Sequence, residues 1–250
     1  MIAEWLYKKA EIGCGIIAPP SSYLPLPWIF YPWLYKTLKA FWTQKKIAGL
    51  GARGVGKTHL IQFLQTGTIP KQYKQTGGTI PYPEAKLSLD GLNLKITEGF
   101  DVSGDTSAYA EWEKIVEYAD IVLYLVRADL LIQEDVLTIK RAESDIKHIK
   151  GWLDSQTSYH DALKKVGFLK NAPRFYILGT HCDQDSNFNK LTSFNSGDYQ
   201  DKFMQIPAVK RLISQAGGLT KVKVIMGSMK TQEQTKELVY KLLQQENING

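Results

Sequence analysis

Residues 45–64, KKIAGLGARGVGKTHLIQFL, contain the pattern that decides the fold. A short apolar run leads into a turn with Gly51, Gly54 and Gly56, and a Lys57-Thr58 pair then precedes apolar residues at helical spacing. Glycine weakens both strands and helices, so three glycines within six residues indicate a backbone that side chains would obstruct. The segment predicts a strand, a glycine-rich loop and a helix in immediate succession.

The glycine-rich loop fits the pattern G-x-x-x-x-G-K-[S/T] from Gly51 to Thr58. In such a loop, backbone N–H groups converge on phosphate oxygens, and the following helix directs its positive dipole end at the same anion. We expect Lys57 to reach the β- and γ-phosphates in a catalytic role, and the Thr58 hydroxyl to bind Mg²⁺. The nucleotide-binding residues predicted in this segment are Arg53, Gly54, Val55, Gly56, Lys57, Thr58 and His59.

The chain from residue 45 onward alternates strand and helix patterns, which predicts an α/β domain over residues 45–250. Lys46–Leu50 and the runs DIVLYLVRA, RFYILGT and KVKVIMGS are typical of buried strands. Alternating apolar residues on both sides of Asp90-Gly91 predict a hairpin. The expected architecture is a mostly parallel sheet of about six strands flanked by helices, with one antiparallel hairpin edge. The polar stretch at residues 184–200 is expected to be a loop.

The composition is that of a globular protein with a core, at 44% hydrophobic and 22% charged residues. Cys14 and Cys182 cannot form a disulfide framework, and no signal peptide opens the sequence, so we expect a cytoplasmic location. The net charge of +6 is spread along the chain, which favours a solvated surface and no specific nucleic-acid binding. The histidines and cysteines show no zinc-binding spacing.

Residues 1–44 differ from the rest, because they contain four of the six tryptophans and five of the ten prolines. No residue from Ile12 to Tyr35 is charged, but the prolines argue against a plain transmembrane helix. Two interpretations remain open. The segment is either an aromatic arm that packs on protein, or a membrane contact through residues 12–35, where interfacial Trp and Tyr are favoured. The second interpretation makes the protein peripheral to a membrane.

Three further motifs follow predicted strands. Asp101-Val102-Ser103-Gly104 ends the hairpin, Thr180-His181-Cys182-Asp183 ends RFYILGT, and Ser228-Met229-Lys230 follows KVKVIMG. The carboxyl ends of strands in an open α/β sheet are where ligands bind. The four motifs in this order resemble the guanine-nucleotide-binding set of the Ras-like small GTPases, whose last two motifs read NKxD and SAK. The THxD form also looks like that of the Roco family's GTPase domain.

The resemblance extends over about residues 45–245 and implies a P-loop GTPase domain that binds GTP and GDP with Mg²⁺. It implies that Asp183 accepts hydrogen bonds from guanine N1–H and N2, a donor pair that adenine lacks. Met229 would offer its backbone N–H to guanine O6, and Lys230 would pack near the base beside Ser228. Thr180 can hydrogen-bond towards the phosphate loop, and His181 can stack on the base or ribose.

The resemblance also implies a switch. Asp101 would hold Mg²⁺ through water, and the Gly104 N–H would meet the γ-phosphate. A threonine that binds Mg²⁺ only in the triphosphate state is either Thr76 or Thr79, and we favour Thr79 because Gly77-Gly78 gives the loop freedom to close. Residues 68–84 and 101–110 would then change order with the nucleotide, and a protein effector or complex partner would detect the change.

Two residues predict slow hydrolysis. Asp105 stands where the family usually has a glutamine that positions water, and a carboxylate cannot donate a hydrogen bond to an oxygen. Arg53 crowds the route of an external arginine finger, or supplies a positive charge of its own as a second catalytic candidate. Two other functions stay open: a nucleotide-locked or empty scaffold in a larger complex, and an ATP-using P-loop enzyme.

Overall fold

The computed structural model describes residues 43–70, 80–89, 92–101, 103–165, 173–188 and 196–247. Residues 1–42 of the expected arm, Thr76, Thr79 and the turn at Asp90-Gly91 lie outside these ranges. Membrane contact through residues 12–35 therefore stays a prediction. Among the helices within the described ranges, none is sufficiently long and apolar to cross a bilayer.

The described residues alternate strands and helices as the sequence pattern predicts. The strands are β1 (Thr43–Leu50), β2 (Ile80–Tyr82), β3 (Ala85–Leu89), β4 (Leu92–Asp101), β5 (Ile121–Arg127), β6 (Arg174–Thr180) and β7 (Val222–Met226). The α-helices are α3 (Lys57–Thr66), α4 (Tyr109–Tyr118), α5 (Ala128–Ile132), α6 (Val136–Lys165), α8 (Ser196–Gln205), α9 (Pro207–Gln215) and α10 (Gln232–Asn247). Two short 3₁₀ turns cover Thr106–Ala108 and Cys182–Gln184.

The strands form one sheet in the order β2-β4-β1-β5-β6-β7, and β3 pairs with β4 as well. Five strands run parallel, namely β4, β1, β5, β6 and β7, while β2 and β3 are antiparallel to β4. Leu89 pairs with Leu92, so the expected hairpin is present. The chain is therefore α/β with a parallel sheet, and the part that the structure describes has seven strands, against about six expected.

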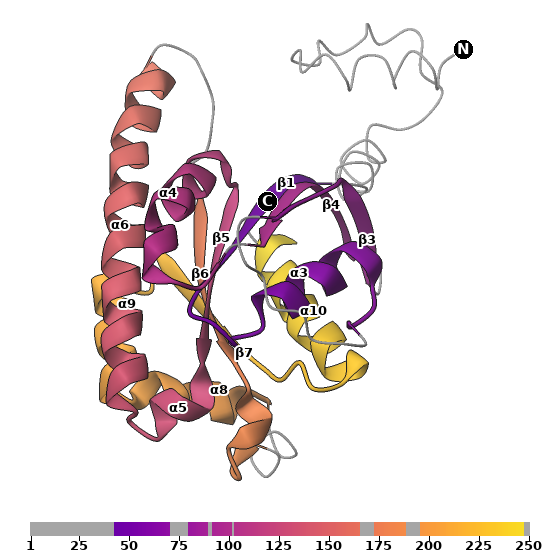
Figure 1. Cartoon of the computed structure of the whole chain (residues 1–250), viewed down its shortest axis with the longest axis vertical. Coiled ribbons are helices and arrows are strands. Elements are labelled where there is room, and N and C mark those ends of the chain that lie inside the picture. Colours follow the sequence, from indigo (N-terminus) through magenta and orange to yellow (C-terminus); the bar gives the residue numbers. More distant parts are fainter. Residues whose placement is uncertain are drawn as a thin grey trace, which may run out of the picture. The chain divides into compact units, whose positions relative to one another are not determined.

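Helices cover both faces of the sheet (Figure 1). The core between the sheet and α3 and α10 is separate from the core beneath α4, α6 and α9. Alternate residues of β5 supply the two cores: Ile121, Leu123 and Leu125 face α3 and α10, and Val122, Tyr124 and Val126 face the other side. Successive side chains on a strand point to opposite faces, so a strand buried on both faces reads as an unbroken apolar run.

One expectation is wrong. Residues 196–200, assigned to a polar loop, form the first half of α8. The reason is an amphipathic pattern that the surrounding polar letters conceal: Tyr199 and Phe203 are four residues apart, share one helix face and are both buried. Phe188 packs edge-on against Tyr199, with ring centroids 4.9 Å apart.

Candidate functional site

The glycine-rich loop from Gly51 to Gly56, called the phosphate loop below after its expected ligand, joins β1 to α3 at the carboxyl edge of the sheet. Because β4, β6 and β7 run parallel to β1, the segments that follow them leave the sheet at this same edge. The structure therefore brings Ser103–Asp105, His181–Asp183 and Ser228–Lys230 to the edge where the phosphate loop lies. These segments are far apart in the sequence.

The backbone of the phosphate loop has conformations that only glycine adopts without strain. Gly51 has φ +138°, and a methyl group there would lie 2.2 Å from the Leu125 carbonyl oxygen. Gly56 has φ +93°, and a methyl group there would lie 2.4 Å from Cε of Met229. The loop is therefore pressed against β5 at its start, and against the segment that follows β7 at its end.

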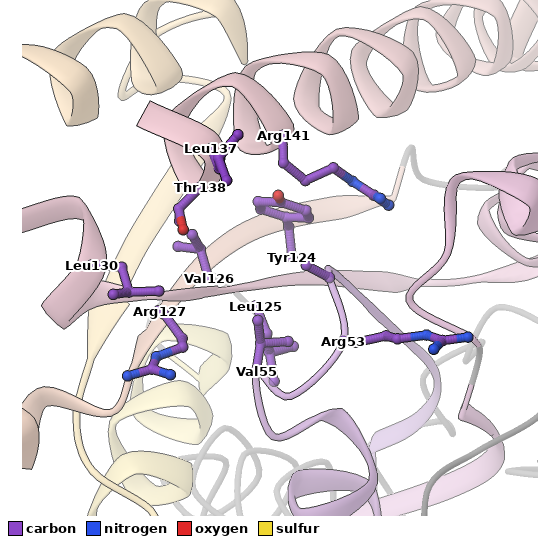
Figure 2. A pocket seen from close by; sticks show the side chains of 11 residues that line it. Arg53, Val55, Tyr124, Leu125, Val126, Arg127, Leu130, Leu137, Thr138 and Arg141 are labelled. Atoms are coloured by element: carbon purple, nitrogen blue, oxygen red, sulfur yellow. The ribbon is translucent and has the colours of Figure 1, made fainter. Parts of the chain in front are cut away.

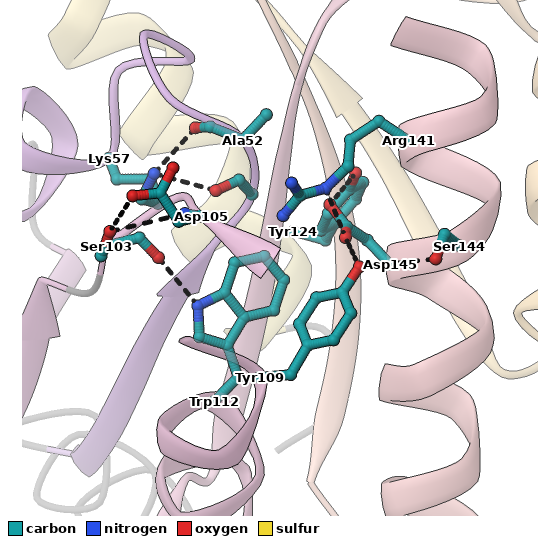
Figure 3. A network of polar contacts seen from close by, with 11 residues as sticks. Ala52, Lys57, Ser103, Asp105, Tyr109, Trp112, Tyr124, Arg141, Ser144 and Asp145 are labelled. Carbon is teal, nitrogen blue, oxygen red and sulfur yellow. Dashed lines mark hydrogen bonds and ion pairs between the residues drawn. The ribbon is translucent and has the colours of Figure 1, made fainter. Parts of the chain in front are cut away.

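The Lys57 ammonium group lies inside the curve of the loop. Its Nζ donates hydrogen bonds to the carbonyl oxygens of Gly51, at 2.9 Å, and Ala52, at 2.8 Å (Figure 3). Lys57 is 7% exposed, so the loop encloses a nearly buried positive charge. Thr58, the next residue, lies in the first turn of α3 at the same end of the helix.

Thr180 connects the phosphate loop to β6. Its hydroxyl is fully buried and donates to the Val55 carbonyl oxygen at 2.9 Å, which confirms the expected bond towards the loop. Nδ1 of His181 lies 3.0 Å from the same hydroxyl oxygen. The hydroxyl also lies 3.3 Å from the Val126 carbonyl oxygen, and since its one proton goes to a carbonyl, a tautomer with the proton on Nδ1 lets His181 donate to the hydroxyl oxygen.

The Asp183 carboxylate is held by two neighbours. Oδ1 accepts a hydrogen bond from the Ser228 hydroxyl at 2.8 Å, and Oδ2 accepts one from Gln184 Nε2 at 2.8 Å. The Ser228 oxygen accepts from the backbone N–H of Lys230 at 3.1 Å and lies 2.9 Å from Oε1 of Gln234. The two glutamines were missed from the sequence, since their role depends on contacts that no spacing rule encodes.

Two histidines lie near the junction of the loop and β6. Burial lowers the pKa of His59 below its ordinary value of 6.5, and the charge of His181 lowers it further. Burial also lowers the pKa of His181, with a second contribution from the Arg127 guanidinium. Within the described part of the chain, Nε2 of His59 is buried and makes no hydrogen bond. Both imidazoles are therefore expected to be neutral at pH 7.

Arg53 and Asp105, which the sequence assigned to separate roles, form an ion pair. Asp105 also accepts a hydrogen bond from the Ser103 hydroxyl, with 3.3 Å between the oxygens (Figure 3). Gly104 lies between Ser103 and Asp105 in the sequence, and a methyl group on it would lie 2.4 Å from the Arg53 backbone nitrogen and 2.5 Å from the Ala52 carbonyl carbon. The segment after β4 is thus packed backbone to backbone on the phosphate loop.

A second polar network joins α4, β5 and α6 beside this segment (Figure 3). Asp145, fully buried on α6, accepts hydrogen bonds from Tyr109 at 2.5 Å, Tyr124 at 3.0 Å and Arg141 Nε at 2.7 Å. Trp112 on α4 donates from Nε1 to the Ser103 carbonyl oxygen at 3.0 Å. The sequence signal for the network was weak: an Arg-Asp pair four residues apart on a helix is usually solvent-exposed.

A cavity of about 230 Å³ lies on the β5 and α6 side of the phosphate loop (Figure 2). Ala52, Arg53 and Val55 form its wall on the loop side, and Leu137 and Arg141 are among the residues of α6 that line it. None of the residues expected to contact a base lines this cavity. Arg53 and Val55, two of the residues expected to bind nucleotide, do line it, so the cavity borders the glycine-rich loop.

The expected metal site lies partly outside the described side chains. Asp101 ends β4, where its backbone pairs with Gly49 of β1 and with Ile80 of β2. The Thr58 hydroxyl and the Asp101 carboxylate are both oxygen ligands, the kind that Mg²⁺ requires. The fold brings the backbones of both residues to the same edge of the sheet.

Two comparisons with known proteins were negative. No protein-family model matches the chain, and no curated protein sequence shows significant similarity to it.

Proposed function

We propose that this chain is a guanine-nucleotide-binding switch with a Ras-like P-loop GTPase domain, which binds GTP or GDP with Mg²⁺ and hydrolyses GTP slowly. The observation that carries the proposal is the Thr180–Val55 hydrogen bond. It joins the loop suited to phosphate with the segment that ends at Asp183. One ligand of nucleotide length would then contact both segments.

The phosphate end of the site is supported by Lys57. Its ammonium is held by two loop carbonyl oxygens, which accept hydrogen bonds as phosphate oxygens do. A bound nucleotide would supply charged acceptors, and hydrogen bonds to charged acceptors are the stronger ones. The N–H groups at the start of α3 add to the attraction for an anion.

The base end is supported by Asp183. Its two hydrogen-bonded neighbours fix the carboxylate at the carboxyl edge of β6, and each carboxylate oxygen can accept a further bond. A guanine would supply donors at N1 and N2, whereas adenine has no such pair. A site built to bond a donor strongly disfavours an analogue that lacks it. Met229 and Lys230 directly follow Ser228, which is bonded to Asp183, and would complete the base contacts.

The metal end combines Thr58, Asp101 and Thr79. Ile80 of β2 pairs with Asp101 of β4, and Thr79 directly precedes Ile80 in the sequence, whereas Thr76 lies three positions further away. This pairing favours Thr79 over Thr76. These residues would hold Mg²⁺, whose chemistry at this site would be to neutralise part of the phosphate charge.

A competition titration tests the proposal. Purified full-length chain is titrated with GTP, GDP and ATP in the presence of Mg²⁺, by calorimetry, and the titration is repeated with Asp183→Asn. Preference for GTP and GDP in the wild type, lost in the variant, supports the assignment. Equal binding of ATP and GTP in both chains contradicts it and favours an ATP-using P-loop enzyme.

A nucleotide-free scaffold is the second candidate, and a specific observation favours it. Lys57 is bonded by the loop itself, and Asp105 is paired with Arg53, so these three charged side chains have partners without a ligand. Native mass spectrometry of the purified chain distinguishes the candidates, because a carried guanine nucleotide adds its mass to the protein. Absence of binding to every nucleotide supports the scaffold, with partner contact through residues 68–84 and 101–110.

A further inference from the structure

The ion pair of Arg53 and Asp105 connects two segments that the proposed function treats differently. Arg53 belongs to the phosphate loop, and Asp105 belongs to the segment after β4 that is expected to respond to the γ-phosphate. The two residues are 52 positions apart in the sequence. Their contact is therefore a property of the fold and does not follow from local chain geometry.

The pair is the side-chain part of a larger contact. Beneath it, Gly104 lies so close to the backbone of Ala52 and Arg53 that no side chain fits at that position. Ser103 bonds the Asp105 carboxylate on one side and receives the Trp112 indole N–H on its carbonyl oxygen. The carboxylate is thus held at the outer surface of the phosphate loop, on the side of the arginine.

We propose that Arg53 is the residue that distinguishes a triphosphate from a diphosphate, because its guanidinium exchanges the Asp105 carboxylate for the terminal phosphate. This assignment rests on the proposed function and adds to it the residue that detects the γ-phosphate. In a diphosphate complex the guanidinium stays paired with Asp105. In a triphosphate complex the pair opens, and Asp105 turns away from the phosphate.

The exposure of the pair makes such an exchange feasible. The Arg53 side chain is 58% exposed and the Asp105 side chain 38% exposed, so water screens their attraction and the pair is weak. A terminal phosphate carries more charge than a carboxylate, and its oxygens match the planar fork of a guanidinium. Asp105 would then face a like charge without its partner, and repulsion would displace it.

If this exchange occurs, substitutions of Asp105 and of Arg53 should change triphosphate affinity in opposite directions. The carboxylate competes with the γ-phosphate for the guanidinium, so Asp105→Asn should strengthen binding of the triphosphate about two- to fivefold. Arg53→Gln should weaken binding of the triphosphate by a similar factor. Both changes should alter diphosphate affinity less than triphosphate affinity, since in this proposal only the terminal phosphate of the triphosphate displaces the carboxylate.

The experiment is a calorimetric titration of full-length wild type, Asp105→Asn and Arg53→Gln with Mg²⁺ and either GDP or the slowly hydrolysed analogue GTPγS. Glu143→Gln is the matched control, because it also removes the carboxylate of an exposed ion pair, with Arg211 at 2.9 Å, and Glu143 lies on α6 outside the proposed site. Thermal unfolding of each variant shows that the exposed substitutions leave the fold intact.

The expected result is a ratio of GTPγS to GDP affinity that rises in Asp105→Asn, falls in Arg53→Gln and is unchanged in Glu143→Gln. An equal shift of both affinities in either variant, or an unchanged ratio, overturns the assignment of Arg53 while the proposed function stands. Binding of neither nucleotide by the wild type overturns the proposed function, and the assignment with it.

Discussion

Replacing Thr180 by valine tests the contact that carries the functional argument. Valine has nearly the shape of threonine, so Thr180→Val removes the hydroxyl from a fully buried position with little change in packing. The Val55 carbonyl loses a 2.9 Å hydrogen bond, and a buried polar group without its partner costs about 1–3 kcal/mol. At about 2–4 °C per kcal/mol for a domain of this size, we expect the Tm to fall by about 2–12 °C.

The assay combines thermal and urea unfolding with nucleotide titration. Thr235→Val is the matched control, because Thr235 is also fully buried and donates its hydroxyl to the Thr231 carbonyl at 2.8 Å. That carbonyl keeps a second bond from the Thr235 backbone N–H at 3.0 Å, so the control should lose less than about 1 kcal/mol. The control should also leave nucleotide affinity unchanged, since Thr235 lies on α10.

Thr180→Val should lower nucleotide affinity as well as stability, because Val55 lies within the phosphate loop. A free energy of unfolding of Thr180→Val equal to that of the wild type within about 0.3 kcal/mol would show that the bond contributes nothing. Weakening of nucleotide binding to the same extent by Thr235→Val would also contradict a specific role of Thr180. The loss would then reflect general destabilisation.

Four other predictions follow from the site. Asp183→Asn should weaken GTP binding at least about tenfold and improve binding of xanthosine triphosphate, measured by competition; unchanged GTP affinity would show that Asp183 does not contact the base. Single-turnover hydrolysis by the wild type should stay below about 10⁻² per second, and Arg53→Ala should slow it further if Arg53 stabilises charge; an unchanged or faster rate in the variant removes that role. Gly56→Ala should abolish phosphate binding, because φ of +93° strains any other residue; titration with GDP measures it, and wild-type affinity would contradict the loop's role. The pKa values of His59 and His181 are lowered in the folded chain, so below pH 6.5 the unfolded chain binds more protons at these groups than the folded chain does. The free energy of unfolding should therefore decrease as the pH falls below 6.5, and these two groups should not change it above that pH. Urea unfolding of a His59→Gln, His181→Gln double variant should show a weaker dependence over that range, and an identical pH profile would count against the assignment.

The fold was largely predictable, because its main strands carry their own signal. An apolar run such as residues 121–126 is buried on both faces and is recognisable without knowledge of its neighbours. The Asp90-Gly91 hairpin was predictable for the same local reason. The short strand β2 was not, since three residues that include Pro81 are stabilised by pairing with the end of β4, a contact between segments about twenty residues apart.

The candidate site was predictable only where backbone conformation or a fixed spacing decides it. The glycine positions of the phosphate loop and the bond from Thr180 belong to that class. The pairing of Arg53 with Asp105 and the bonds of Asp145 to two tyrosines do not, because each joins side chains far apart in the sequence. No periodicity or propensity specifies such contacts, and they follow from the packing of whole elements.

The attachments of the phosphate loop give the two edges of the sheet unequal resistance to local opening. The loop begins at the central strand β1, is bonded to β6 by Thr180 and packs on Met229 just beyond the outermost strand β7. Separation of β7 therefore requires disruption at the centre of the sheet, so this edge should exchange amide hydrogens only with global unfolding. The opposite edge consists of the three residues of β2 and the five of β3, and it should open first.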